Sequence, residues 1–377
     1  MAGAGAVPAG WARPQAAMMA SLLAEIDTVA AVVQVIREDD RERHGDHYDP
    51  AAEQDGGMSE IADLYHRWAR VAARGSSPTY ERLALAVAED DAVLRLLESV
   101  EIGKRQPNLL FGALRWHGVP VEDPVQSLAW ARAHPDRILA VLRSRRTQTN
   151  EVARCATILP ALAQLPQPLA LIEVGASAGL CLLYDCWRYH YTGASVDQWI
   201  GPADSPVTLS CEVDGNVPLP AAVPTIAWRV GLDLNPLDAR EPADRRWLQC
   251  LVWPEHHDRA RTLPAALDVA VDIAPRIEKG NLVSDLPALI NQAPSNVTLV
   301  VVHSATLSYL DQHDREVFTA MLSRHGGHRL GCEGPGVLPQ LTTQLPPDIW
   351  VSGRFLLSVD DRVLGLAHPH GRALRWL

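Results

Sequence analysis

The chain has 377 residues, with 34 Lys or Arg and 45 Asp or Glu, so its formal net charge is −11. An apolar fraction of 47% suffices for a folded core and excludes wholesale disorder, and the acidic balance argues against a nucleic-acid-binding surface. No stretch of about 18 uncharged apolar residues occurs, so no membrane span is predicted. Six cysteines without a C-x-x-C pair, and an N-terminus without a signal-like segment, predict a cytoplasmic protein.

The first part of the chain shows helical periodicity and no strand-like alternation. A helix is predicted over 15–38, and the charged run from there to residue 57 is interpreted as a solvated linker rather than an interaction arm. Residues 58–165 are predicted to form an all-helical cap domain, called the helical cap below. Its helices are expected over 60–73, 78–88, 92–98, 108–117, 124–133, 135–142 and 149–162, the last capped by Thr147 or Thr149.

From residue 166 the pattern changes to strands that alternate with helices. The chain is expected to form a buried strand at 168–174, a buried helix at 180–189 and an irregular or hairpin insertion at 192–227. The elements expected next are a strand at 225–234, a helix at 244–252, a strand at 297–302, a helix at 315–324 and a strand at 328–333. The tail should form antiparallel strands at 354–359, 363–367 and 372–377, with a turn at Asp360-Asp361.

These patterns predict an α/β fold over 166–377. The sheet should be Rossmann-like and mostly parallel, with a C-terminal antiparallel hairpin, and the helical cap should precede it.

A run of small residues between the first strand and the helix expected after it is the main chemical signal. Glu173-Val-Gly175-Ala-Ser177-Ala-Gly179 resembles the acidic glycine turn of Rossmann-like S-adenosylmethionine-dependent methyltransferases. In that class the turn lies under the amino-acid part of the cofactor. Asp233, at the end of the strand predicted over 225–234, resembles the acid that holds the ribose hydroxyls, although it lies 54 residues (233 − 179) beyond Gly179.

The resemblance implies S-adenosylmethionine as the cofactor. Its binding residues would be Glu173, Gly175, Ser177, Gly179 and Asp233. The resemblance also suggests Asp285 as the partner of the adenine amino group, with the alternative that Asp285 caps a helix over 286–291.

Two other interpretations of the turn stay open. Gly175-Ala-Ser177-Ala-Gly179 also fits the G-x-S-x-G nucleophile elbow of α/β-hydrolases, for which Asp233 or Asp285 and His303 or His370 would complete a triad. That fold places several strands before the serine, whereas only helices are predicted there. The remaining interpretation is a tight turn that holds no ligand.

Polar residues elsewhere complete the candidate site. His303 and Glu333 each end a predicted strand, where ligands of open α/β sheets bind, so they are catalytic candidates together with His370. Gln148, Asn150, Glu151 and Arg154 lie at the start of the helix predicted over 149–162 and could together line a pocket. Of these, Gln148, Asn150 and Arg154 are expected to bind substrate. The alternative is that the group only caps the helix and forms an exposed face. No metal is assigned, although His303, Glu333, His368 and His370 are a conceivable set for zinc or iron.

Several blocks together resemble an uncharacterised bacterial family, domain-of-unknown-function family 2332, over about residues 58–377. They are Thr147–Glu151 with Arg154, the turn Glu173–Leu180, Arg229–Asp233, Trp247, Val252–Pro254 and His370-Gly371. Cys181 stands where the family's Gly-Leu-Asn stretch has an asparagine. The resemblance implies no activity.

The sequence therefore predicts S-adenosylmethionine-dependent methyl transfer to a small-molecule acceptor, with no nucleic-acid or membrane partner. A base such as His303 would deprotonate the acceptor, and the helical cap would build the substrate pocket and exclude water. A serine hydrolase that uses Ser177, and a non-catalytic or metal-binding protein, are the alternatives. The segment His256-His257-Asp258 is interpreted as a surface turn.

Overall fold

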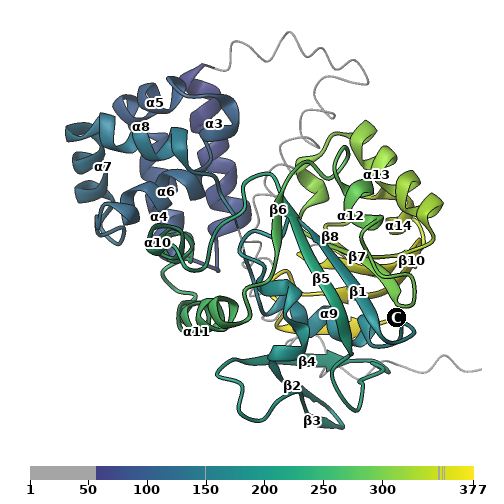
Figure 1. Ribbon diagram of the computed structural model, residues 1–377. Coiled ribbons are helices and arrows are strands. Elements are labelled where there is room, and N and C mark those ends of the chain that lie inside the picture. Colours follow the sequence, from purple (N-terminus) through teal and green to yellow (C-terminus); the bar gives the residue numbers. More distant parts are fainter. Residues whose placement is uncertain (1–56, 149, 347–348, 350, 352) are drawn as a thin grey trace, which may run out of the picture.

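The computed structural model describes residues 57–377, apart from 149, 347–348, 350 and 352. The described chain has a helical part and an α/β part, which lie side by side (Figure 1). The helix predicted over 15–38 and nearly all of the charged linker fall outside the described residues. Within the described residues, no helix is both long and apolar enough to cross a membrane.

The helices predicted for the helical cap are present up to residue 144. They are α3 (Met58–Trp68), which continues as the π-helix η2 (Ala69–Ala73), α4 (Pro78–Ala88), α5 (Asp91–Glu98), α6 (Pro107–Trp116), α7 (Pro124–Ala133) and α8 (Pro135–Ser144). Proline begins four of these helices, because the first turn needs no backbone N–H donor. Ser77, Asp90 and Asp123 accept backbone N–H groups at the starts of α4, α5 and α7.

Eleven strands of the described chain form one sheet, in the order β3-β2-β4-β11-β10-β9-β8-β7-β1-β5-β6. Their bounds are β1 (Leu169–Val174), β2 (Arg188–Gly193), β3 (Val196–Ile200), β4 (Thr208–Asp214), β5 (Ile226–Asp233), β6 (Ile277–Lys279), β7 (Thr298–Ser304), β8 (His328–Glu333), β9 (Phe355–Val359), β10 (Arg362–Ala367) and β11 (Ala373–Trp376). The predicted mixed α/β fold with helices first is confirmed.

The run β6-β5-β1-β7-β8 is parallel throughout. Counted along the chain, its order is the 3-2-1-4-5 of doubly wound folds, and the order reverses between β1 and β7. Val174, the last residue of β1, is in register with Leu232 of β5 and His303 of β7. The carboxyl ends of the three strands therefore meet at a switch point, where ligands of such sheets bind.

Helices cover both faces of this sheet (Figure 1). On one face, α9 (Arg154–Leu162) and α11 (His257–Ile273) belong to the large core that extends into the helical cap. On the other, α12 (Leu286–Ile290), α13 (Gln312–His325) and α14 (Pro339–Thr342) pack on Val174, Leu232 and Val301. Side chains alternate along a strand, so Glu173 of β1 points to the α9 face and His303 of β7 to the α13 face.

The C-terminal prediction is confirmed. Strands β9, β10 and β11 pair antiparallel, and Asp360 and Asp361 form the turn between β9 and β10. Strand β9 also pairs antiparallel with β8, which joins this meander to the parallel core.

Three predictions of local structure are wrong at least in part. The stretch 180–189 forms two 3-10 turns, η4 (Leu180–Leu182) and η5 (Tyr184–Cys186), before β2 begins, because an apolar run does not by itself distinguish a helix from other buried structure. Of the two alternatives for 192–227, the hairpin is correct in part, since β2 and β3 pair antiparallel. The irregular alternative is wrong, because β4 pairs with β2 and with β11 and so joins this hairpin to the sheet.

The third error concerns the helix predicted over 149–162. It begins only at Arg154, with Ala153 at its N-cap, so Thr147 does not cap it, and Thr149 lies outside the described residues.

Candidate functional site

The glycine turn, residues 175–179, is fastened to the end of β5. The Gly175 N–H donates to the Leu232 carbonyl at 2.8 Å, and the Ser177 N–H donates to Asp233 Oδ2 at 2.8 Å. The Ser177 carbonyl accepts the Leu237 N–H at 3.1 Å. The predicted turn and the predicted ribose acid are thus brought together directly.

Close packing accounts for the glycines of this turn. A Cβ on Gly175 would overlap the Thr306 side chain, and one on Gly179 would approach Ile277 Cδ1 to 3.0 Å. Both glycines have φ values near +75°, in the left-handed region that side chains rarely adopt. Thr306 follows β7, so the turn interlocks with the loops on both sides of β1.

Asp233 accepts backbone N–H groups with both of its oxygens. The second bond comes from the Asn235 N–H to Oδ1 at 2.7 Å. Since a carboxylate oxygen has more than one lone pair, this partly exposed group keeps acceptor capacity. Asp285 lies farther along the sheet edge, where Oδ2 accepts the Asn281 N–H at 2.7 Å; its side chain does not cap α12.

Three buried polar groups near the end of β1 have unused hydrogen-bonding capacity. Glu173 is 6% exposed and its Oε2 has no partner in the described structure. Ser177 Oγ and Arg154 Nη2 are also buried, and neither has a hydrogen-bond partner in the described structure. Buried polar atoms without partners are uncommon and costly, so these three need an explanation.

The electrostatic setting of Glu173 is unusual for a carboxyl group. Burial raises its pKa well above the ordinary value, and Cys181 and Asp233 add to the increase, against the opposing effect of Arg154. Arg154 itself is held rigidly, because its Nε donates to the Pro369 carbonyl at 2.8 Å and its Nη1 to Ser304 Oγ at 3.2 Å.

The loop between α8 and α9 carries two of the predicted substrate residues, Gln148 and Asn150, and both touch the turn region, while the third, Arg154, begins α9. Asn150 Nδ2 donates to the Ala176 carbonyl at 3.0 Å. Gln148 and Asn235 form a reciprocal pair, with Gln148 Nε2 on the Asn235 carbonyl at 2.7 Å and Asn235 Nδ2 on Gln148 Oε1 at 3.0 Å.

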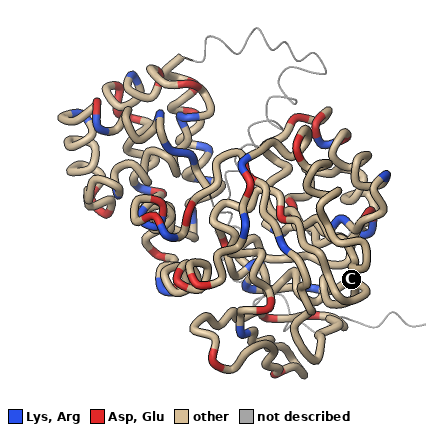
Figure 2. The backbone as a smooth tube through the Cα atoms, viewed as in Figure 1, with Lys and Arg blue, Asp and Glu red and all other residues tan. Residues whose placement is uncertain are grey.

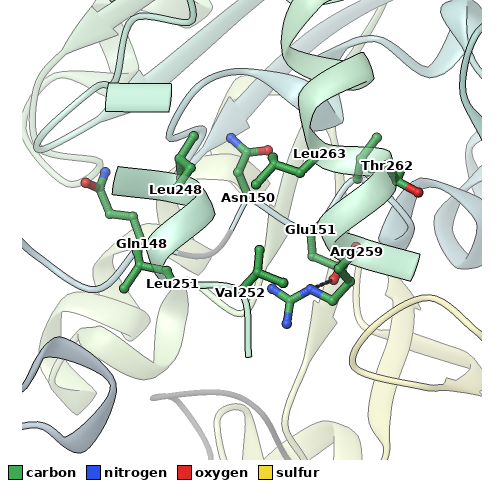
Figure 3. Close-up of a pocket in the computed structure, with 10 residues that line it drawn as sticks. Gln148, Asn150, Glu151, Leu248, Leu251, Val252, Arg259, Thr262 and Leu263 are labelled. Atoms are coloured by element: carbon green, nitrogen blue, oxygen red, sulfur yellow. Dashed lines mark ion pairs between the residues drawn. The ribbon is translucent and has the colours of Figure 1, made fainter. Parts of the chain in front are cut away.

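A small pocket of about 20 Å³ opens beside this loop, which is room for a water molecule (Figure 3). It lies between the loop, the region around the end of α10 (Pro242–Cys250) and the first turns of α11. Its lining combines apolar and polar side chains, which are Gln148, Asn150, Glu151, Val152, Leu248, Leu251, Val252, Arg259, Thr262 and Leu263.

A buried charged cluster borders the pocket. Sequence reasoning named Glu151 and His370 as candidates but missed Arg259 and the burial of His256. Glu151, 4% exposed, accepts Arg259 Nε at 2.5 Å and His370 Nδ1 at 3.2 Å, both on Oε2 (Figure 3 shows the Arg259 pair). Arg259 Nη1 in turn donates to His256 Nδ1 at 3.1 Å. His256 is buried, so the prediction of a surface turn at 256–258 is wrong for this residue, and α11 begins directly after it.

The titration behaviour of this cluster follows from burial and from Arg259. Burial alone would raise the pKa of Glu151, but Arg259 and His370 outweigh it and hold that pKa far below its ordinary value. Burial, reinforced by Arg259, lowers the pKa of His256 to about 2 and that of His370 to about 3. Both imidazoles are therefore neutral near pH 7, and His256, which accepts from Arg259 on Nδ1, presents Nε2–H to Ser76 Oγ at 3.0 Å.

The predicted catalytic residues are divided between the two faces of the sheet. His303 Nδ1 donates to Glu333 Oε1 at 2.9 Å, and the same oxygen accepts the Thr306 and Leu307 N–H groups at 3.0 and 3.1 Å. His303 is fully buried, its ring 5.5 Å from that of Phe318 on α13, and burial lowers its pKa. This pair holds the loop after β7, whereas His370 holds Glu151 near the α9 face.

The alternative metal set is not assembled by this arrangement. His303 pairs with Glu333, while the His368 and His370 rings lie tilted to each other with centroids 5.8 Å apart. Among residues 57–377, as far as the structure describes them, no group of three or more His, Cys, Asp or Glu is placed to hold a metal ion.

Gly371, next to His370, gives a test of the packing around Glu151. Its φ is +72°, and a Cβ would overlap the Ala153 carbonyl, so Gly371→Ala should lower the free energy of unfolding by at least about 2 kcal/mol. Gly118 has the same φ but open space around it, so Gly118→Ala isolates the backbone strain and should cost less. Urea unfolding of the two variants measures the difference, and equal losses would contradict the close contact.

A family model described as "Uncharacterized protein conserved in bacteria (DUF2332)" matches residues 62–376. The match covers most of the chain, so the chain belongs to this bacterial family, as the sequence blocks predicted. Searches of curated proteins and of solved structures gave no significant match. The likeness to methyltransferases therefore stays a prediction that depends on the site alone.

Proposed function

We propose that this DUF2332 member binds S-adenosylmethionine at the glycine turn and transfers its methyl group to a small-molecule acceptor. The proposal rests on two buried atoms near the end of β1, Glu173 Oε2 and Arg154 Nη2, which have no hydrogen-bond partner in the described structure. One belongs to an acidic side chain and the other to a basic one. The amino-acid end of the cofactor has an ammonium and a carboxylate, which complement a carboxylate and a guanidinium.

The other residues at the switch point suit the rest of such a molecule. Asp233 keeps lone pairs for ribose hydroxyls, and Asp285 lies farther along the same edge for the adenine amino group. Leu234 directly follows β5, and Tyr309 is the last residue of the 3-10 turn η6 (Leu307–Tyr309). They are 59% and 51% exposed, so they offer apolar surface to a base.

Bound S-adenosylmethionine would supply an electrophilic methyl group on a sulfonium centre. The chain would contribute mainly position, because in-line transfer depends on how donor and acceptor are held. Gln148 and Asn150, beside the turn, would face the acceptor, and the helical cap would exclude water. His303, Glu333 and His370 are buried, so in this proposal they hold the surrounding loops.

Calorimetric titration with S-adenosylhomocysteine tests the proposal without requiring an acceptor. We expect saturable micromolar binding by the parent chain and a loss of at least about tenfold in Asp233→Asn, since a hydrogen bond to a charged group contributes about 1.5–3 kcal/mol. Asp204→Asn, at an exposed site on another part of the surface, is the matched control and should bind like the parent. No binding of either S-adenosylmethionine or S-adenosylhomocysteine by the folded parent would contradict the proposal.

A serine hydrolase is the second candidate, favoured by one observation. Ser177 has a φ of +51°, a strained backbone of the kind that nucleophile elbows adopt. Its Oγ contacts no base in the described structure, which disfavours an activated nucleophile. Covalent labelling by a fluorophosphonate, absent in Ser177→Ala, would support this candidate over methyl transfer.

The proposal includes a cytoplasmic location and a small molecule as the only class of partner. All six cysteines are free thiols, as is usual in reducing compartments. Acidic and basic residues are interspersed over both parts of the described chain in Figure 2, and the formal net charge of −11 disfavours a nucleic-acid partner.

A further inference from the structure

We infer that Glu151 is a positioning residue, through which the helical cap fixes the glycine turn. The inference concerns the site of the proposed function, and its first test requires no ligand. The helical cap holds the segment between α10 and α11 tightly.

The helical cap anchors this segment at three residues close together in the sequence. Trp253 is buried among cap aromatics, with its ring centroid 5.2 Å from Trp68, and its Nε1 donates to Asn108 Oδ1 at 2.9 Å. Glu255 accepts the Thr79 N–H at 2.9 Å and the Ser77 hydroxyl. His256 bonds Ser76, as described above. The start of α11, and with it Arg259, therefore moves with the cap.

Glu151 joins three segments that are far apart in the sequence. Its Oε2 binds Arg259 of the cap-anchored helix and His370 of the loop between β10 and β11, while Oε1 accepts the Ala153 N–H at 3.2 Å. At 4% exposure the carboxylate is shielded from water, which strengthens each of these contacts.

The same loop carries the contacts to the turn. Asn150, one residue before Glu151, donates to the Ala176 carbonyl, and the Glu151 carbonyl itself accepts the Cys181 thiol at 3.5 Å. Glu151 thus holds in place a loop that contacts the turn at residue 176 and again just after residue 179. Without its carboxylate, Arg259 and His370 no longer fix this loop.

Hydrogen exchange of the ligand-free protein measures the predicted coupling. In Glu151→Gln, amides at 175–179 should exchange about tenfold faster, while those of Val300–Val302 in the sheet centre stay near the parent rate. Equal acceleration in both regions would overturn the inference, because Glu151 would then only hold the fold together. Glu316→Gln, on the exposed side of α13, is the matched control and should change neither region.

Three further variants keep the test decisive if Glu151→Gln fails to fold. Asn150→Leu leaves the ion pair intact but removes the contact with Ala176, and it should accelerate exchange at the turn alone. Arg259→Lys keeps the charge near Glu151 and should restore most of the protection that Arg259→Met loses. Unchanged exchange at 175–179 in both Asn150→Leu and Arg259→Met would overturn the inference.

Binding of S-adenosylhomocysteine by the same variants is measured in a separate experiment. If the parent binds S-adenosylhomocysteine, the variants with faster exchange at the turn should bind it about tenfold more weakly. If the parent does not bind it, the proposed function is contradicted, whereas the exchange result still decides the role of Glu151.

Discussion

The Glu173→Gln variant is expected to be more stable than the parent at pH 8 and to bind S-adenosylhomocysteine about 10- to 100-fold more weakly. Both effects come from one buried carboxyl group, of which the Oε2 atom has no hydrogen-bond partner in the described structure. Replacing it by a neutral amide removes the cost of ionising it in the protein interior. The same change removes the negative charge that we assign to the cofactor ammonium.

The sign of the pH dependence follows from the raised pKa of Glu173. Above pH 4.5 the Glu173 carboxyl group loses its proton in the unfolded chain but keeps it in the folded chain. The stability that this group contributes therefore falls as the pH rises from 4.5 toward the raised pKa that Glu173 has in the folded chain. The advantage of Glu173→Gln over the parent should therefore grow between pH 5 and pH 8, to about 1–3 kcal/mol. Urea unfolding at both pH values measures it, with the exposed Glu212→Gln as control.

Calorimetry in two buffers of different ionisation enthalpy adds an independent readout. A protonated Glu173 that ionises on contact with an ammonium group releases a proton, so the apparent binding enthalpy of the parent should depend on the buffer. The residual binding of Glu173→Gln should not. Buffer-independent binding by the parent would exclude Glu173 as the ammonium site.

The elements that could be predicted from the sequence are those whose signal is local. The apolar runs of β1 and β7, and the prolines that begin α4, α6, α7 and α8, indicate their structure within a few residues. The stretch after Gly179 is different, because its apolar residues show no periodicity that separates a helix from other buried structure. Its secondary structure is therefore decided by tertiary packing. Helix α11, with Pro264 inside it, also lacked a clear local signal.

The same distinction separates the two halves of the candidate site. Glu173, the glycine turn and Asp233 follow strand ends, and parallel strands bring such ends together, so their proximity could be predicted. The partners of Glu151 lie 108 (259 − 151) and 219 residues away, and no local pattern connects them. The His370-Gly371 block was visible in the sequence, but its reason, the close approach of Gly371 to Ala153, is a tertiary contact.

Acidification is expected to destabilise the protein steeply from about pH 6.5 downward. Three buried histidines, His256, His303 and His370, have pKa values lowered by burial, so they stay neutral in the folded chain while their unfolded counterparts take up protons. Each such group lowers the free energy of unfolding by up to about 1.4 kcal/mol per pH unit in this range. Below about pH 4.5, protonation of Glu151 in the unfolded chain adds a further loss.

The variant His256→Gln tests which groups cause this slope. A glutamine can accept from Arg259 and donate to Ser76 as the neutral imidazole does, but it does not titrate. Between pH 6.5 and pH 5 its unfolding free energy should therefore fall about a third less steeply than that of the parent. His325→Gln, on the exposed end of α13, should leave the slope unchanged. If His256→Gln also leaves it unchanged, His256 is not a neutral buried group, and the charge balance assigned to the cluster around Glu151 is wrong.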